Sequence, residues 1–344
     1  MKQRPVVRLV KSPPPNKAEG FFLTSSAQRA SANRPKDLLG LRDLKAPQIT
    51  SILDQAVDYK RRLHNENFKA TDLAGKTVMN LFFEPSTRTR TSFELAARKL
   101  SAQVLNMSPQ TSSLSKGESL KDMVENLEAM RPDLLVVRHA ASGVPGLIAH
   151  YTTAGVVNAG DGSHEHPTQA LVDLFTVREI LGKISGIRLL IVGDIAYSRV
   201  ARSNIYGFSK LGAKVTAVGP ATLLPPGLEK LGASHVSTDL NKHLREADVI
   251  MLLRIQKERQ ESLNFPSLAE YSRFYGLTSD RLPLLKREAL IMHPGPINRG
   301  IEIDPEIADN RDKQGPQTII LKQVENATAV RMAVLSLWGG KSRL

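Results

Sequence analysis

The chain has 344 residues, a length that exceeds one usual hydrophobic core and predicts two domains of roughly 150 residues each. It has no cysteine, which excludes disulfides, thiolate metal sites and a thiol nucleophile, and no apolar run approaches the ~18 residues of a membrane span, so we expect a soluble, cytoplasmic protein. The formal charge of +13 favours anionic ligands, whereas an aromatic content of only 5% argues against stacking platforms for single-stranded nucleic acid.

Residues 1–36 carry eight Lys or Arg and one acid, Glu19, and so account for +7 of the charge. They contain three consecutive prolines, Pro13 to Pro15, and no sustained hydrophobic period, a pattern typical of disorder. An acid-poor N-terminus with Arg and Ser also fits an organellar transit peptide, but the prolines and the weak amphipathicity argue against that reading. We expect a disordered basic extension and no nucleic-acid partner.

From Asp37 onward, predicted strands alternate with predicted helices. In the first half, we expect helices at 43–63, 87–100, 119–130, 144–151 and 167–181, and strands at 76–84, 102–107, 134–137 and 155–158. The apolar face of the third helix should include Leu120, Met123, Val124, Leu127 and Met130. These elements make up a predicted domain of residues 37–182, which ends near the glycines of 182–186.

The second half repeats the scheme. We expect strands at 188–193, 213–218, 234–237, 248–253, 289–292 and 318–321, and helices at 199–211, 226–232 and 240–246. This predicted domain, 183–321, is followed by a segment, 322–344, with a C-terminal helix at 322–338. The alternation predicts an α/β protein with two doubly wound parallel-sheet domains. Ligands of such sheets bind beyond the carboxyl ends of the strands, so we expect the active site in the cleft between the domains.

The segment Phe82 to Glu94, FFEPSTRTRTSFE, joins a buried strand to a helix. Ser86 is the expected N-cap, so the hydroxyls of Ser86, Thr87 and Thr89 gather at a helix N-terminus, where free N–H groups attract anions. Arg88 adds a guanidinium fork that suits phosphate. Arg88 and Arg90 lie about 200° apart on a helix, and we expect Arg88 to face the ligand. The alternative is a capped helix with a solvated basic turn.

This motif resembles the carbamoyl-phosphate signature of the aspartate/ornithine transcarbamoylase family. The resemblance extends from about Leu39 to the C-terminus, and later motifs are similar to those of the aspartate-using members. It implies transfer of a carbamoyl group from carbamoyl phosphate to L-aspartate, in pyrimidine biosynthesis. It also implies that Ser86, Thr87, Arg88 and Thr89 hold the phosphate group.

The segment Ser112 to Glu118, SSLSKGE, is polar and predicts a mobile loop, or simply an ordinary solvated one. The resemblance implies that this loop crosses from a neighbouring subunit. Lys116 would then contact both substrates, and Ser113 (or its neighbour Ser112) would contact the phosphate. A shared loop of this kind implies a homotrimer.

Arg138 follows a predicted strand, and His166 and Gln169 begin a predicted helix. A histidine at a helix start tends to stay neutral, so it can donate a hydrogen bond to a carbonyl oxygen and, with Arg138, form an oxyanion site. Taking the motifs together with the resemblance, we add Thr89 to the oxyanion site and expect Gln169 to orient the carbamoyl nitrogen. The rival interpretation takes His164–Glu165–His166 as a metal cluster, but no further ligand stands nearby in sequence, so we expect neither a metal nor a cofactor.

Arg199 and Arg254 each follow an apolar strand, and Gln256 lies on the side of Arg254 if the chain stays extended. Two arginines can grip a dicarboxylate through bidentate contacts. The alternative is structural ion pairing, with Asp194 or Glu258 as partner. The resemblance implies that these positions bind the carboxylates of aspartate. The turn at Gly193 lacks the GxGxxG spacing of dinucleotide sites.

The motif His293 to Pro296, HPGP, follows another strand, and its prolines leave backbone carbonyls exposed in a fixed turn. A plain rigid turn would look the same. The resemblance implies that the carbonyls at Gly295 and Pro296 accept hydrogen bonds from carbamoyl and amino groups. Many aspartate-using relatives have leucine at the position of Gly295.

Two other functions compete with this reading. An ornithine carbamoyltransferase would resemble members with a cysteine in the motif occupied here by HPGP. A non-catalytic protein that binds anions or nucleic acid would use the basic extension. The resemblance also allows a regulatory chain or a dihydroorotase as partner, and allosteric effectors that the sequence does not identify.

Overall fold

The computed structural model describes residues 36–65, 67–107, 117–256, 267–309 and 315–339. The predicted disordered extension lies outside these residues, except for Lys36. In the first half the helices and strands are α1 (Ala46–Leu63), β1 (Thr77–Phe82), α2 (Thr87–Lys99), β2 (Gln103–Met107), α3 (Leu120–Ala129), β3 (Leu134–His139), α4 (Val144–Tyr151), β4 (Gly155–Asp161) and α5 (Pro167–Leu181). The second half contains β5 (Arg188–Val192), α6 (Arg199–Lys210), β6 (Lys214–Val218), η3 (Ala221–Leu223), α7 (Leu228–Leu231), β7 (Ala233–Ser237), α8 (Leu240–Leu244), β8 (Val249–Leu252), α9 (Leu268–Tyr275), η5 (Ser279–Leu284), β9 (Leu290–Met292), α10 (Pro305–Ala308), β10 (Gln317–Thr318) and α11 (Ile320–Gly339).

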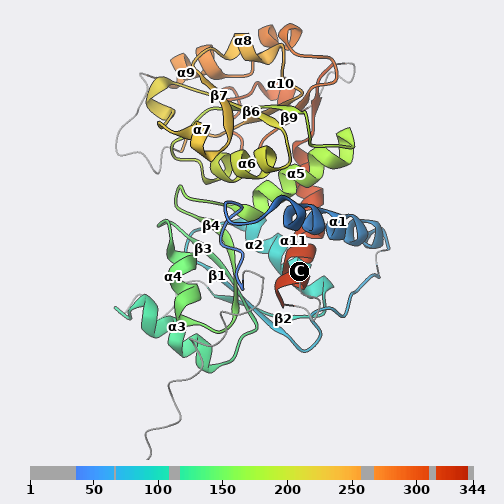
Figure 1. Cartoon of the computed structure of the whole chain (residues 1–344), viewed down its shortest axis with the longest axis vertical. Coiled ribbons are helices and arrows are strands. Elements are labelled where there is room, and N and C mark those ends of the chain that lie inside the picture. The colour runs from blue at the N-terminus through green and yellow to red at the C-terminus, as the bar shows by residue number, and fades with distance from the viewer. Residues whose placement is uncertain (1–35, 66, 108–116, 257–266, 310–314, 340–344) are drawn as a thin grey trace, which may run out of the picture. The chain divides into compact units, whose positions relative to one another are not determined.

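The strands form two parallel sheets, which confirms the predicted fold class. The first sheet has the order β2-β1-β3-β4, and the second has the order β10-β9-β8-β5-β6-β7. Helices cover both faces of the first sheet, with α1, α2 and α11 on one side and α3 and α4 on the other (Figure 1). Central strands of both sheets read as continuous apolar runs because both of their faces are buried.

Helix α5 is buried on nearly all sides, because it packs on α1, α6 and α11 as well as on β4. An all-round apolar helix is expected at such a place. It ends at Leu181, and the next residue, Gly182, caps it with a φ of 74°, which favours glycine. Because α5 packs on α6 of the second half as well as on elements of the first, it lies where the two halves of the chain meet.

The last helix, α11, returns to the first half of the chain. Its most extensive packing is against α1, α2 and α5, and its residues from Ala329 to Trp338 are buried. The backbone N–H of Ile319 donates to the carbonyl of Ile291, so the chain leaves the edge of the second sheet one residue before α11 begins.

Three sequence-based predictions are corrected by the structure. Met130, predicted to lie on the buried face of α3, is 68% exposed, because α3 ends at Ala129. The predicted strand 318–321 is shortened to β10, and Ile320 and Leu321 begin α11. The short helices α9 and α10 were not predicted.

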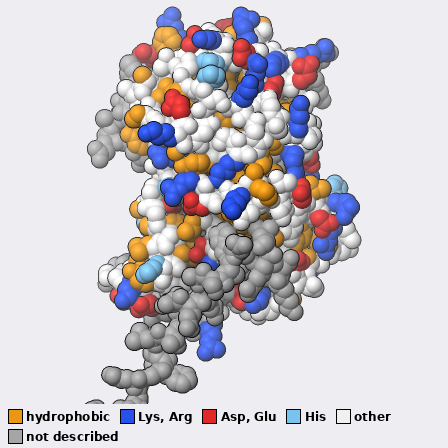
Figure 2. All heavy atoms as spheres, in the orientation of Figure 1, with side chains coloured by type: hydrophobic (Ala, Val, Ile, Leu, Met, Phe, Trp, Pro, Cys, Tyr) orange, Lys and Arg blue, Asp and Glu red, His pale blue; other side chains and the backbone are white. Residues whose placement is uncertain are grey.

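Across the described residues, every helix is too short or too polar to cross a membrane. On the face in Figure 2, Lys and Arg side chains are interspersed with acidic and apolar ones. The described part of this face therefore carries mixed charges rather than one continuous basic stripe.

Candidate active site

A cavity of about 770 Å³ lies between the two sheets and takes its walls from both halves of the chain. Its lining contains every described residue to which the sequence assigned a binding or catalytic role: Ser86, Thr87, Arg88, Thr89, Arg138, His166, Gln169, Arg199, Arg254, Gln256, Gly295 and Pro296. Ser112, Ser113 and Lys116 lie outside the described residues. The motifs are spread over more than 200 positions of sequence, and the fold brings them to one place.

The first wall is the N-terminus of α2. Ser86 is the N-cap residue, with an extended backbone (φ −160°, ψ 101°), and its side chain makes no capping hydrogen bond. The first N–H groups of α2 are therefore not capped by Ser86 and remain available to an anion. Thr89, one turn into the helix, is buried.

Arg88 and Arg90 differ in what they face. Both side chains are exposed, but Arg88 lines the cavity and Arg90 lies outside the lining. Partial burial, together with the positive charge of Arg254, lowers the pKa of Arg88. Arg88 is on α2 and Arg254 follows β8, so guanidinium groups from both halves of the chain share one cavity. An anion between them would relieve their repulsion.

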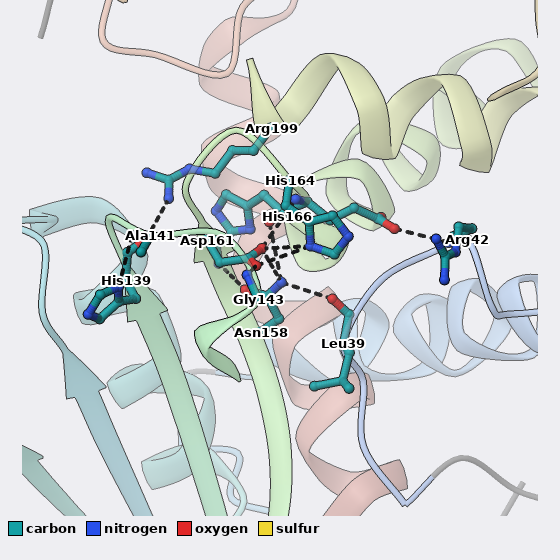
Figure 3. A network of polar contacts seen from close by, with 12 residues as sticks. Leu39, Arg42, His139, Ala141, Gly143, Asn158, Asp161, His164, His166 and Arg199 are labelled. Atoms are coloured by element: carbon teal, nitrogen blue, oxygen red, sulfur yellow. Dashed lines mark hydrogen bonds and ion pairs between the residues drawn. The ribbon is translucent and has the colours of Figure 1, made fainter. Parts of the chain in front are cut away.

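Glu84 joins the two halves of the site. Its Oε2 lies 2.5 Å from Nη2 of Arg199 and 3.2 Å from Nε of Arg138. Arg199 is buried, and its Nη1 also donates to the carbonyl of His139 at 3.4 Å (Figure 3). Arg199 therefore pairs with Glu84, an acid that was not considered as its partner from the sequence. Asp194 binds two backbone N–H groups, and Glu258 lies outside the described residues.

His166 is the N-cap residue of α5 and is buried. Its backbone N–H donates to Oγ of Ser203 at 2.9 Å, and Ser203 donates to Glu165 at 2.8 Å. Glu165 also accepts the N–H of Leu41 at 2.7 Å, and burial raises its pKa. His166 is thus tied to α6 and to the segment before α1, which fixes the backbone that carries the imidazole.

The neighbouring polar groups have separate partners (Figure 3). Asp161 accepts a hydrogen bond from Asn158 at 2.7 Å and lies 3.1 Å from Nδ1 of His164. Burial would raise the pKa of Asp161, but these hydrogen bonds lower it overall. His164, Glu165 and His166 therefore do not converge, and no group of three or more acidic or histidine side chains in the described ranges is arranged to hold a metal ion.

On the opposite wall, Nη2 of Arg254 donates to Oε1 of Gln256 at 3.2 Å, so both side chains lie on one side of the chain. Asp194 is fully buried and accepts the backbone N–H groups of Gln256 and Tyr197, each at 3.0 Å. Asp194 thereby fixes the loops that follow β5 and β8; the first leads to Arg199 at the start of α6, and the second carries Arg254.

The turn after β9 completes the cavity. Nδ1 of His293 accepts the N–H of Gly295 at 2.8 Å, so Nε2 is the donor to Glu302, 3.1 Å away. Gly295 has a φ of 67°, and a Cβ at this position would lie 2.7 Å from Nη2 of Arg88. The absence of a side chain therefore lets the Arg88 guanidinium approach the turn.

Four residues of the site were missed from the sequence. Glu84 stands inside the FFEPSTRTR motif, and an acid beside a cationic pocket was a usable signal. Asp173, Gln323 and Arg331 lie on helices at apolar spacing, and their common signal is a polar side chain on a face that should be buried.

The fold and the site together define a two-domain α/β protein whose interdomain cavity is built for anions. Two family models match the chain: "Aspartate/ornithine carbamoyltransferase, carbamoyl-P binding domain" over residues 36–179, and "Aspartate/ornithine carbamoyltransferase, Asp/Orn binding domain" over residues 185–338. The chain therefore belongs to the aspartate/ornithine carbamoyltransferase family, which confirms the resemblance inferred from the FFEPSTRTR motif.

Similar proteins point in the same direction. The chain is 53% identical to an aspartate carbamoyltransferase catalytic subunit of Syntrophotalea carbinolica, over 90% of this chain and 97% of the relative. A second such subunit, from Syntrophobacter fumaroxidans, is 54% identical over 89% and 98%. Among solved structures, aspartate transcarbamoylase from Trypanosoma cruzi in complex with N-(phosphonacetyl)-L-aspartic acid is similar, with a TM-score of 0.81, 28% identity and coverage of 90% and 97%. Ornithine carbamoyltransferase from Pyrococcus furiosus has a TM-score of 0.79, 30% identity and coverage of 91% and 99%.

Proposed function

We propose that this protein transfers the carbamoyl group of carbamoyl phosphate to the amine of L-aspartate, giving N-carbamoyl-L-aspartate and phosphate, an early step of pyrimidine biosynthesis. Family membership and the names of relatives above 50% identity support the proposal. The observation that carries it is the shared cavity of Arg88 and Arg254. Both substrates are anionic, and the reaction brings a phosphate and a dicarboxylate together.

On the carbamoyl phosphate side, the start of α2 is the proposed phosphate site, with Ser86, Thr87, Arg88 and Thr89 as donors. Thr89, Arg138 and His166 would hold the oxyanion that forms when the amine attacks the carbonyl carbon. The carbamoyl –NH₂ needs acceptors, and we assign these to Gln169 and to the carbonyls at Gly295 and Pro296.

On the aspartate side, Arg199, Arg254 and Gln256 would bind the two carboxylates. Arg199 already pairs with Glu84, so its role requires it to share or exchange that partner. Lys116 and Ser113 would act from the loop of a neighbouring subunit, which makes the proposed assembly a homotrimer. A cytoplasmic location and association with a regulatory chain or a dihydroorotase stay predictions.

The chemistry needs no side-chain nucleophile. The neutral amine attacks, the C–O bond to phosphate breaks as the tetrahedral intermediate collapses, and the amine proton leaves, with the departing phosphate as the proposed acceptor. The rate enhancement then comes from positioning and electrostatic stabilisation. We propose that residues 37–182 provide the carbamoyl phosphate side and 183–321 the aspartate side, with 322–344 packing on the first domain.

The direct test compares aspartate and ornithine as acceptors of the carbamoyl group. We expect product with aspartate, and a rise of about 100-fold in the KM for aspartate in Arg254→Ala, because a charge-assisted contact is lost. The affinity for carbamoyl phosphate should change by no more than about twofold. Preference for ornithine, or unchanged use of aspartate in the variant, would contradict the assignment.

A further inference from the structure

A buried carboxylate lies beneath the cavity. Asp173 is on α5, one turn after Gln169, and is fully buried. Its Oδ1 accepts hydrogen bonds from Nε2 of Gln169 at 2.9 Å and from Nε2 of Gln323 at 2.8 Å. Its Oδ2 accepts from Nδ2 of Asn204 at 2.9 Å. Amide groups from three helices, α5, α6 and α11, therefore converge on one acid.

The chemistry of these groups fixes their orientation. An ionised carboxylate only accepts hydrogen bonds, whereas a side-chain amide has a donor end and an acceptor end. Each glutamine must therefore turn its –NH₂ toward Asp173 and its oxygen away. Gln323 shows the result, because its Oε1 accepts the backbone N–H of His293 at 3.0 Å. That bond holds the turn that contains Gly295 and Pro296.

Gln169 lines the cavity, and its –NH₂ group is engaged by Asp173. The end that Gln169 offers to a ligand is consequently Oε1, an acceptor. On the second wall, the turn held by Gln323 offers backbone carbonyls, which are also acceptors. Through these contacts, one buried acid makes both walls offer hydrogen-bond acceptors to a ligand.

We propose that Asp173 is a positioning residue that makes the site selective for an acyl phosphate whose acyl group carries hydrogen-bond donors, as the –NH₂ of a carbamoyl group does. The inference rests on the proposed function, since it concerns the same substrate. Asp173 does not touch the substrate. It acts through Gln169 directly, and through Gln323 on the turn after β9.

The charge of Asp173 is compatible with this role. Burial raises its pKa to about 6, so the group is ionised at neutral pH and above. The charged group that faces it is Arg331 of α11, whose pKa burial lowers to about 10 and which therefore stays positive. The other described partners on α5, α6 and α11 are amides and do not titrate.

The variant that tests the proposal is Asp173→Asn, which keeps the size of the side chain but lets each neighbouring amide turn either way. The probe is acetyl phosphate, which has a methyl group where carbamoyl phosphate has –NH₂. We expect the ratio of the two dissociation constants, measured by calorimetry, to move about tenfold toward acetyl phosphate, as expected for one hydrogen bond. A ratio equal to that of the wild type would overturn the proposal.

The matched control is Asn204→Ala, which removes the third amide of the cluster from the side that does not line the cavity. It should lower stability but leave the ratio within about twofold, so a general loosening of the core is distinguished from loss of selectivity. A shift in the control as large as that in Asp173→Asn would count against the proposal.

Should Asp173→Asn fail to fold, Gln169→Met removes the oriented acceptor while leaving Asp173 bound to Gln323, and the same tenfold shift is expected. An unchanged ratio in that variant would overturn the proposal equally. Carbamoylaspartate formation by the wild type is a separate readout. Its absence would reject the proposed function, whereas its presence with an unchanged ratio in the variants would reject only the positioning role.

Discussion

The two walls of the cavity hold their arginines in different ways. On the first wall, no acid among the described residues pairs with Arg88, which stands at a helix N-terminus whose N-cap side chain makes no capping bond. On the second wall, Arg199 is buried against Glu84, and Arg254 contacts Gln256. The first wall therefore has a cation available to an anion, while on the second wall protein groups already contact the arginines that we propose as ligands of the dicarboxylate. This difference favours binding of the phosphate-bearing substrate before the diacid.

The largest expected effect comes from removing Arg88, the cation of the first wall. Arg88→Ala should lower kcat/KM by about 10³-fold, because it deletes both phosphate binding and stabilisation of charge in the transition state. Steady-state kinetics with both substrates measures this. The matched control, Arg98→Ala, removes an exposed arginine from the end of the same helix and should stay within about twofold. Equal losses in the two variants would abolish the distinction between the walls.

Asp173, which is buried beneath the cavity, should make the stability of the protein depend on pH. The pKa of Asp173 rises from its usual 3.8 to about 6 on burial, which corresponds to roughly 3 kcal/mol. Because the folded state binds the proton more tightly than the unfolded state, stability falls as pH rises from about 4 to about 6, and is level above that. Urea unfolding of the wild type and Asp173→Asn at fixed protein concentration should therefore diverge across this window. Parallel pH curves would show that Asp173 is not shifted.

Removing Glu84, the acid that pairs with Arg199, should have an intermediate effect on activity. Glu84→Ala leaves Arg138 and Arg199 without their shared carboxylate, so their guanidinium groups lose orientation. We expect kcat/KM for aspartate to fall about tenfold. Glu94→Ala, which removes an acid paired with Arg98 on α2, is the control and should have little effect. A gain in aspartate affinity for Glu84→Ala would instead mean that Glu84 only competes with the substrate.

The smallest expected effect concerns the contact between the walls. Gly295→Ala and Gly300→Ala both place a side chain at positive φ, 67° and 78°, and each should cost about 1 kcal/mol of stability. Only at Gly295 would the new Cβ meet Arg88, since at Gly300 no described residue beyond its chain neighbours has an atom within 4 Å of the corresponding position. We expect the KM for carbamoyl phosphate to rise a few-fold in the first variant alone. The same KM in both variants would show that Arg88 moves aside freely.

Local patterns predicted much of this molecule. The helices at 144–151 and 167–181 have the predicted bounds, because a proline near each start and an apolar face define them. The described motif residues were found because each follows an apolar strand, and parallel strands end at the same edge. The predicted strand 318–321 was right only at Thr318, which lies in β10; its isoleucines favour a strand, but tertiary packing makes the chain helical from Ile320.

Contacts between segments that are far apart in the chain could not be predicted from the sequence. Glu84 and Arg199 are 115 positions apart, and Asp173 and Gln323 are 150 apart. Neither pair leaves a periodic pattern in the sequence, because a hydrogen bond needs only one donor and one acceptor close together. Buried polar groups follow the partners that the fold supplies, so the supporting network under the cavity became visible only in three dimensions.

The return of α11 has a consequence for biogenesis. Val330, Val334 and Leu337 share one core with Ile49 and Leu53 of α1 and with Phe93 of α2. The first sheet thus borrows part of its interior from a helix that is synthesised after all the strands of the second sheet. Folding during synthesis normally proceeds from the N-terminus domain by domain, but here the leading domain has to wait for α11, made after the second sheet, before its apolar surface is sealed.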